Sequence, residues 1–257
     1  MLTIQQIKEN YPEEIFRRNP KGIIVEYLQY ELLDSIFKQK NSEKLSFIGG
    51  TAIRIIYKSQ RFSEDLDFDN FGISYIDFKK LLEKAIKDMM VKSFDIHYKM
   101  VKKDAYHCYI KFPELLFRHG LSPHVNEKIL VRVDATTKKI NTLPKVVVLG
   151  GFDVYRKILV NNAAVILTQK LMTIIQRKRE KGRDFYDVSY LLGLAKPDYE
   201  YLKKEFGLNK KQLKSEVLKK ANSLNMKTLA KDTLPFLINP DDQQRILSFK
   251  EYIEQEL

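Results

Sequence analysis

The chain has 257 residues, of which 44% are hydrophobic and 30% charged, so it can bury a sizeable core in one or two domains. No apolar run is long enough to span a membrane, the first residues lack a signal-peptide layout, and Cys108, the only cysteine, cannot form an internal disulfide. These features exclude membrane-spanning and disulfide-scaffold classes and predict a cytoplasmic protein in a reducing compartment.

The formal net charge of +12 favours an anionic partner, nucleic acid first. The excess is concentrated in residues 177–232, which hold 15 Lys and Arg against 8 Asp and Glu. Residues 233–257 reverse the balance, with 2 basic against 5 acidic residues. A merely solvated, lysine-rich surface is the alternative interpretation.

The elements predicted from hydrophobic periodicity change type along the chain. The first 40 or so residues have helical spacing, residues 44 to about 160 alternate short strands with short helices, and only helices follow. This pattern predicts an α+β fold, with a mixed sheet and flanking helices over residues 1–160 and a C-terminal helical bundle over 161–257. The candidate strands are 44–49, 64–71, 93–101, 105–112, 128–136 and 145–150; the candidate helices are 75–90, 162–180, 183–194, 209–224 and 240–257, the last capped by Asp241 or Asp242.

The densest motif is FIGGTAIRIIYKSQRFSEDLDFD, residues 47–69, in which a strand runs into two glycines and a short helix. Glycines let the backbone approach a ligand closely, and a helix N-terminus favours phosphate. The motif therefore predicts a nucleotide-binding turn, although a plain strand-to-helix connection is the alternative. Its candidate residues are Gly49, Gly50, Thr51 and Arg54, with Arg61 and Ser63 placed to reach the same phosphates.

Asp65 and Asp67 stand two residues apart in a predicted strand, so their carboxylates project from the same face. Two like charges this close repel unless a cation lies between them, and Mg²⁺ prefers carboxylate and phosphate oxygens. Asp134, near the end of an apolar strand, is the candidate third carboxylate. A solvated acidic edge strand and an aspartate that merely begins a turn are the alternatives.

A second motif, TQKLMTIIQRKREKGRDFYDVSYLL, covers residues 168–192. Lys170 lies in an otherwise apolar helix, where an inward-pointing ammonium needs an anion. Gly182 is expected to separate this helix from the next, on which Asp184 and Asp187 share a face. An ion-paired surface between two helices is the alternative interpretation.

Taken in order, GGTAIR, RFSEDLDFD and LTQKLMTIIQRKREKGRDFYDV resemble the AbiEii/AbiGii nucleotidyltransferase toxin family, relatives of the MenT toxins in the DNA polymerase β-like superfamily. The resemblance spans roughly residues 40–195. It implies an Mg²⁺-dependent enzyme that moves an NMP from an NTP to an acceptor, most often tRNA, and releases pyrophosphate. It also implies the toxin of a toxin–antitoxin or abortive-infection pair, with a separate antitoxin protein. The superfamily more often has Gly-Ser where this chain has Gly50-Thr51, but GGT is common among AbiEii relatives.

The resemblance also implies roles for the motif residues. The glycine turn resembles the triphosphate cradle, and Lys170 resembles the family's essential lysine, which contacts nucleotide phosphates. Two Mg²⁺ ions would activate the acceptor hydroxyl and hold the α-phosphate. The expected catalytic residues are Asp65, Asp67, Lys170 and Asp187; Arg183, Asp184 and Asp187 match the RDxxD element; and the expected metal ligands are Asp65, Asp67 and, by extension from the superfamily, Asp134.

Other functions remain open at this point. A nucleotidyltransferase or phosphotransferase acting on a protein or a small molecule would need the same carboxylates. A non-catalytic RNA-binding relative is a further alternative, against which the intact aspartates argue. A zinc site is not expected, because the histidines and the cysteine lack ligand spacing. Gly150-Gly151 is interpreted as a turn without ligand contact.

Overall fold

The computed structural model describes residues 1–257, which divide into two compact units. Unit 1 comprises residues 1–51, 62–138 and 144–160, and unit 2 comprises residues 52–61, 139–143 and 161–257. The division at residue 160 predicted from the sequence therefore differs in two short segments, 52–61 and 139–143, which pack with the helical unit. The first of these enters unit 2 in the middle of helix α4 (Gly49–Ile55).

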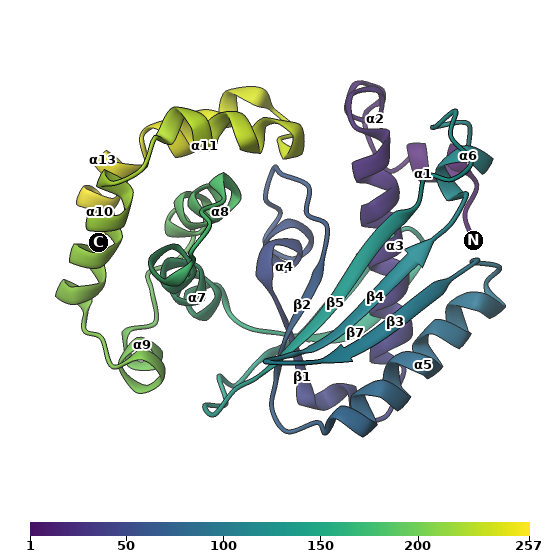
Figure 1. The fold of residues 1–257 in the computed structure, drawn as a ribbon, viewed down its shortest axis with the longest axis horizontal. Helices are drawn as coiled ribbons and strands as arrows, with labels where there is room; N and C mark the ends of the chain where they lie inside the picture. Colours follow the sequence, from purple (N-terminus) through teal and green to yellow (C-terminus); the bar gives the residue numbers. More distant parts are fainter. The chain divides into compact units, whose positions relative to one another are not determined.

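Unit 1 is built on a seven-stranded mixed sheet with the strand order β3-β4-β5-β2-β1-β7-β6 (Figure 1). The pairs β2–β5 and β1–β7 are parallel and all other pairs are antiparallel. The predicted α+β class is thus confirmed. The strands are β1 (Leu45–Ile48), β2 (Leu66–Asn70), β3 (His97–Lys102), β4 (Tyr106–Phe112), β5 (Ile129–Thr137), β6 (Lys145–Gly151) and β7 (Val154–Val160).

The two faces of the sheet differ in chemistry because side chains alternate along each strand. On one face Phe68, Val133 and Cys108 are buried under helices α3 (Pro20–Phe37) and α5 (Tyr75–Val91) (Figure 1). The other face carries polar side chains at the centre of the sheet, among them Asp67 and Asp134. The apolar face therefore forms the core of unit 1, and the polar face is left for chemistry.

Local sequence signals explain where the two main helices of unit 1 begin. The Asn19 side chain accepts from the backbone N–H of Gly22 at the start of α3, and Ser74 accepts from that of Asp77 at the start of α5. Pro20 occupies the first turn of α3, where no intrahelical donor is lost. The remaining helices of this unit are α1 (Ile4–Lys8), α2 (Glu13–Arg18), α6 (Leu115–Arg118) and the 3-10 turn η1 (Ser42–Lys44).

Unit 2 is helical and packs around α8 (Gly182–Leu192), which contacts α7, α11, α12 and α13. Gly182 makes the close contact with α11 possible, because a Cβ there would lie 2.0 Å from the carbonyl oxygen of Leu229. The other helices are α7 (Ala163–Gln176), α9 (Tyr199–Phe206), α10 (Lys210–Asn222), α11 (Met226–Thr233), α12 (Gln244–Leu247), α13 (Phe249–Glu256) and the 3-10 turns η2 (Leu234–Phe236) and η3 (Pro240–Gln243).

Several sequence-based boundaries were wrong. Strand β7 was not predicted; the chain turns at Phe152-Asp153, both at positive φ and directly after the glycines interpreted as a turn, and then pairs back on β6. Helices α9 and α11 were also missed. The expected helix over 240–257 is broken into η3, α12 and α13, and Asn239, rather than an aspartate, caps its first turn. No helix combines the length and apolarity needed to cross a lipid bilayer.

Candidate functional site

Three aspartates of unit 1, Asp65, Asp67 and Asp134, form what we call the carboxylate face. Strands β2 and β5 are parallel, and their register sets Asp67 directly opposite Asp134. Asp65 immediately precedes β2 and is level with Arg132 on β5. The sheet thus gathers on one face three carboxylates from segments more than 60 residues apart in the sequence.

Two cationic or ionisable neighbours accompany this face. The Arg132 guanidinium lies 3.0 Å from Asp65 Oδ2 and 2.8 Å from Asp134 Oδ2, so it is ion-paired with both carboxylates. On the adjacent strand β4, Nδ1 of His107 lies 2.8 Å from Asp134 Oδ1. The aspartates therefore draw positive charge to this face, as the like charges predict.

The negative charges of the carboxylate face outnumber the positive charge of Arg132. Burial raises the pKa of Asp65, and the nearby carboxylates of Asp134 and Glu64 add to the shift, while Arg132 only partly opposes it. For Arg132, burial by itself lowers the pKa, but Asp65, Asp134 and Asp67 together outweigh it and raise the pKa. The Asp65 shift thus comes first from burial and is increased by neighbouring carboxylates, whereas the Arg132 shift comes from the carboxylates and opposes burial.

The glycine turn holds this face in place. Gly49 has φ of +79°, and a Cβ there would lie 2.3 Å from Asp67 Oδ2, so only glycine fits against this carboxylate. The hydroxyl of buried Thr51 donates to the backbone carbonyl of Asp65. Gly50 lies in the first turn of α4 between them. The turn thus positions two of the three carboxylates, and the Thr51 hydroxyl is taken up by the protein itself.

The carboxylate face fits a divalent cation by the chemistry of its donors. No three His, Cys, Asp or Glu side chains are close enough together to enclose an ion by themselves. Asp65, Asp67 and Asp134 nevertheless offer the oxygen ligands that Mg²⁺ prefers, and Mg²⁺ is usually completed by water and substrate phosphate rather than by a full protein cage. The ion-paired Arg132 marks the same place as one that attracts positive charge.

Unit 2 contains a second constellation, which we call the lysine cluster: Lys170, Asp184, Asp187 and Arg61. The Lys170 ammonium lies 3.0 Å from Asp184 Oδ1 and 2.9 Å from Asp187 Oδ2. Arg61 makes a two-pronged contact with Asp187, at 2.7 Å and 2.6 Å. The expected anion partner of the inward-pointing Lys170 is thus found, on helix α8.

In the lysine cluster the carboxylates are fully matched by cations, because Arg177 Nε also lies 3.3 Å from Asp184 Oδ2, whereas on the carboxylate face they are not. Burial raises the pKa of Asp187, but Arg61 and Lys170 outweigh burial and the pKa is lowered. Burial lowers the pKa of Lys170, and Asp187 with Asp184 reverses the shift. Arg61 follows the same rule, with its pKa raised by Asp187 against burial. Arg61, Lys170 and Asp187 are thus held in their charged forms.

The remaining predicted residues lie in varied surroundings. The Arg54 guanidinium donates to the carbonyl of Ser59 at 2.6 Å, and Arg183 stacks its guanidinium 4.2 Å from the Phe236 ring centroid. Half-buried Ser63 accepts at its carbonyl from Gln29. Their assignment to nucleotide binding stays a prediction, as do the catalytic roles of the other motif residues.

Sequence reasoning missed three side chains near the carboxylate face: Arg132, His107 and Tyr109. All three project from the same face as Asp134, because β4 and β5 pair with His107 opposite Asp134 and Tyr109 opposite Arg132. The sequence did contain a signal for these side chains: His107 and Tyr109 alternate on β4, as Arg132 and Asp134 do on β5. It could be used only after the two strands had been paired in register.

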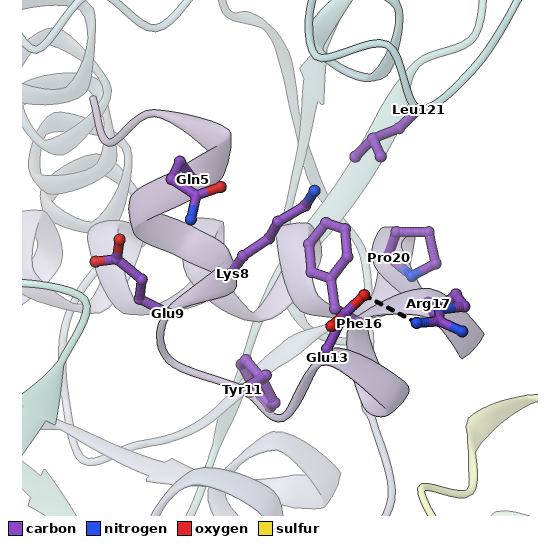
Figure 2. Close-up of a pocket in the computed structure, with 9 residues that line it drawn as sticks. All are labelled: Gln5, Lys8, Glu9, Tyr11, Glu13, Phe16, Arg17, Pro20 and Leu121. Carbon is purple, nitrogen blue, oxygen red and sulfur yellow. Dashed lines mark hydrogen bonds and ion pairs between the residues drawn. The ribbon is translucent and has the colours of Figure 1, made fainter.

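Two hollows of unit 1 differ in their relation to this chemistry. The larger, of about 600 Å³, lies between α1, α2 and Leu121, where Lys8 and Phe16 point inward and Arg17 pairs with Glu13 (Figure 2). It contains none of the predicted site residues. The smaller, of about 370 Å³, is lined by Asp65 and Arg132 and therefore adjoins the carboxylate face.

Comparison with known proteins identifies the family. The family model described as nucleotidyl transferase AbiEii toxin, type IV toxin–antitoxin system, matches residues 31–253. The chain belongs to the AbiEii family. The match spans both motifs and almost the whole chain, so the resemblance inferred from the glycine turn, the paired aspartates and the RDxxD element is confirmed. No curated protein matches the chain.

Two solved structures from Helicobacter pylori share the fold. JHP933 has 17% identity and a TM-score of 0.54, with 95% of this chain and 92% of that chain covered. A candidate nucleotidyltransferase has 17% identity and a TM-score of 0.55, with 95% of each chain covered. At this identity the likeness concerns the fold alone. It covers the sheet and the helices together.

Membership of the AbiEii family establishes the coarse function. The protein is a nucleotidyltransferase of the toxin type, with an NTP as substrate and an antitoxin as partner. The matched residues 31–253 include the carboxylate face and the lysine cluster.

Proposed function

We propose that this AbiEii protein transfers an NMP from an NTP to RNA, with tRNA as the acceptor, and that the carboxylate face binds the Mg²⁺ required. The observation that carries the proposal is the set of three aspartates on one face with a single guanidinium between two of them. Such an excess of negative charge in a partly buried place supports a site for a divalent cation. The net charge of +12 supports an RNA acceptor.

In the proposed reaction an acceptor hydroxyl oxygen attacks the α-phosphorus of the NTP. A new P–O bond forms, the bond between the α-phosphorus and the bridging oxygen breaks, and pyrophosphate leaves while the hydroxyl proton passes to water. Mg²⁺, when bound, would lower the pKa of the attacking hydroxyl and neutralise charge on the phosphates. Asp65, Asp67 and Asp134 would hold it, and Gly49 keeps Asp67 in position.

The lysine cluster has a separate proposed role. The family resemblance assigns Lys170 to the nucleotide phosphates, and its ammonium is kept charged by Asp184 and Asp187. A lysine oriented by two carboxylates reaches a phosphate without losing entropy in finding its position. Asp187 and Arg61 would then act as positioning residues for Lys170. The substrates of this reaction fit a cytoplasmic location.

The test is incubation of the purified protein with Mg²⁺, total bacterial tRNA and each α-³²P-labelled NTP in turn. The Asp65→Ala variant and an EDTA-treated sample accompany it. We expect label on RNA with one or two of the NTPs, lost in both controls. Absence of label on RNA with every NTP would contradict the RNA acceptor.

The alternative functions give different outcomes in the same experiment. Label on protein or on a small molecule would favour a nucleotidyltransferase with another acceptor, and label retained without Mg²⁺ would contradict the metal requirement. RNA binding without transfer under any condition would indicate the non-catalytic relative. The Asp95→Ala variant is the matched control, because Asp95 is an exposed aspartate of the same unit.

A further inference from the structure

The smaller hollow beside the carboxylate face results from a mismatch in strand length. Strand β5 runs from Ile129 to Thr137, but its pairing with β2 starts only at the pair Leu66↔Val133. The first part of β5, up to Arg132, therefore has β4 on one side and no β2 ladder on the other. This notch beside the first part of β5 is the hollow of about 370 Å³.

One wall of the notch is apolar and aromatic. Tyr109 and Leu130 project from the same face of the sheet as Arg132, because Tyr109 pairs with Arg132 and Lys111 with Leu130. Tyr109 is half-buried, and Leu130 is 46% exposed on the part of β5 that has no β2 neighbour. An aromatic ring beside an exposed leucine forms a surface on which a planar base can stack.

The rim of the notch is positively charged. Lys128 precedes β5 and has no ion-pair partner, and Lys21 at the start of α3 pairs only with Glu127, at 2.7 Å. Opposite them the notch is bounded by Glu64 and Asp65. Lys21 is thus neutralised by Glu127, and Arg132 by Asp65 and Asp134, which leaves Lys128 as the rim cation without an ion-pair partner. One unpaired ammonium suits the single charge of a phosphodiester, whereas a triphosphate would carry far more negative charge against Glu64 and Asp65.

The volume also limits the occupant. About 370 Å³ lies near the lower end of the range of small-ligand sites, roughly 300–1,000 Å³, which corresponds to one nucleotide and not to a duplex. Because Asp65 forms part of the wall, a ribose in the notch would place its hydroxyl beside the carboxylate face.

We propose that this notch binds the 3′-terminal nucleotide of the RNA acceptor, with its base stacked on Tyr109 and its phosphodiester paired with Lys128. The inference rests on the proposed nucleotidyl transfer to RNA and adds the acceptor subsite to it. Tyr109 and Lys128 are specificity residues for the acceptor strand, and the NTP binds elsewhere.

The test uses the full chain and a short single-stranded RNA whose 3′-terminal base is 2-aminopurine, a fluorophore that is quenched when it stacks. We expect quenching with the wild type and with Tyr109→Phe, which keeps the ring, and its loss with Tyr109→Ala. Removing a stacking partner should weaken binding of this RNA about tenfold. Tyr155→Ala, at a highly exposed tyrosine of β7, is the matched control and should bind as the wild type does.

Steady-state transfer to tRNA gives the second readout. Tyr109→Ala and Lys128→Ala should each raise KM for the RNA about tenfold and leave KM for the NTP unchanged, with Lys87→Ala as the control for Lys128. Quenching that persists in Tyr109→Ala would overturn the subsite, and so would an increase in KM for the NTP. Failure of nucleotidyl transfer in the wild type would refute the proposed function, whereas the quenching assay, which needs no NTP, still decides the subsite.

Discussion

The carboxylate face of unit 1 and the lysine cluster of unit 2 are made of the same residue types, yet they differ in charge balance. On the face, Asp65, Asp67 and Asp134 share Arg132, and the pKa of Asp65 is raised by burial and its acidic neighbours. In the cluster, Asp184 and Asp187 meet Lys170 and Arg61, and the pKa of Asp187 is lowered.

This difference in charge balance indicates that the two groups of buried charges have different roles, one in stability and one in ligand binding. A balanced cluster is satisfied within the protein, so removing one member leaves its partners buried and unpaired. An unbalanced face is relieved only by a cation from outside, which is the property expected of a metal site. Stability should therefore depend on the cluster much more than on the face, whereas metal binding should depend on the face.

The largest effect on stability is expected for Asp187→Ala. Arg61 and Lys170 would lose their shared carboxylate inside unit 2, at a cost of about 3–5 kcal/mol in the free energy of unfolding measured with urea. Asp187→Leu combined with Arg61→Met should recover much of this loss. Asp241→Ala, at an exposed aspartate, is the control. Equal stability of Asp187→Ala and Asp241→Ala would show that the lysine cluster does not stabilise the fold.

Asp67→Asn should have the opposite profile. Nucleotidyl transfer should fall on the order of 10²–10³-fold, because the variant removes a charge from the proposed metal ligands. The melting temperature should stay the same or rise slightly, since a like charge is removed next to Asp134. A large drop in melting temperature with Asp67→Asn would show that this aspartate serves the fold instead.

The glycine turn provides a matched pair of variants. Gly49 and Gly120 both have positive φ, +79° and +67°, so an alanine at either position costs about 1–2 kcal/mol of backbone strain. Only at Gly49 would the new Cβ meet Asp67; nothing lies within 4 Å at Gly120. Gly49→Ala should therefore lose activity and a further 1–3 kcal/mol or so of stability. Equal activity of the two variants would show that Gly49 is not needed to position Asp67 for activity.

The pH dependence of unfolding tests the same contrast within unit 1. Asp34, bonded to Arg156, Lys38 and Lys92 despite its burial, has a pKa of about 2, below its ordinary 3.8. It therefore stabilises the fold above pH 3.8, by about 2 kcal/mol, and this contribution is lost as the pH falls toward 2.

Asp65 should respond in the opposite direction. Its pKa is raised by burial, so at neutral pH its charge opposes folding, and this opposition disappears as the pH falls below the ordinary value. Urea unfolding at pH 7 should show Asp34→Asn less stable than the wild type and Asp65→Asn equal or more stable. At pH 3 the deficit of Asp34→Asn should be clearly smaller than at pH 7. A stability loss with Asp65→Asn at pH 7 would contradict the unbalanced face.

The smallest effect is expected for Arg132→Ala and concerns metal affinity. Without the Arg132 guanidinium, Asp65 and Asp134 lose their counter-charge. Mn²⁺ should therefore bind about tenfold more tightly in the absence of NTP. Electron paramagnetic resonance of free Mn²⁺ measures this affinity directly. Arg118→Ala, at an exposed arginine paired with Glu114, should bind Mn²⁺ as the wild type does. Weaker binding in Arg132→Ala would mean that the arginine supports the ion.

The sequence by itself determined the local features of this protein. Periodicity predicted six of the seven strands and helix α5 to within a few residues, because alternation and helical spacing are properties of short segments. The glycine turn, the Asp65–Asp67 pair and the RDxxD element were sufficient to place the chain in the AbiEii family. Strand β7 was missed, although the turn before it was predicted close to its observed position.

The tertiary structure alone decided which distant residues meet. The parallel register of β2 and β5 places Asp134 opposite Asp67 and Arg132 level with Asp65, and the β4–β5 register adds His107 and Tyr109. The packing of α7 against α8 gives Lys170 its two carboxylates. A one-residue slip in either strand pairing would turn these side chains to the opposite face, and no local pattern specifies the register between segments so far apart in the chain.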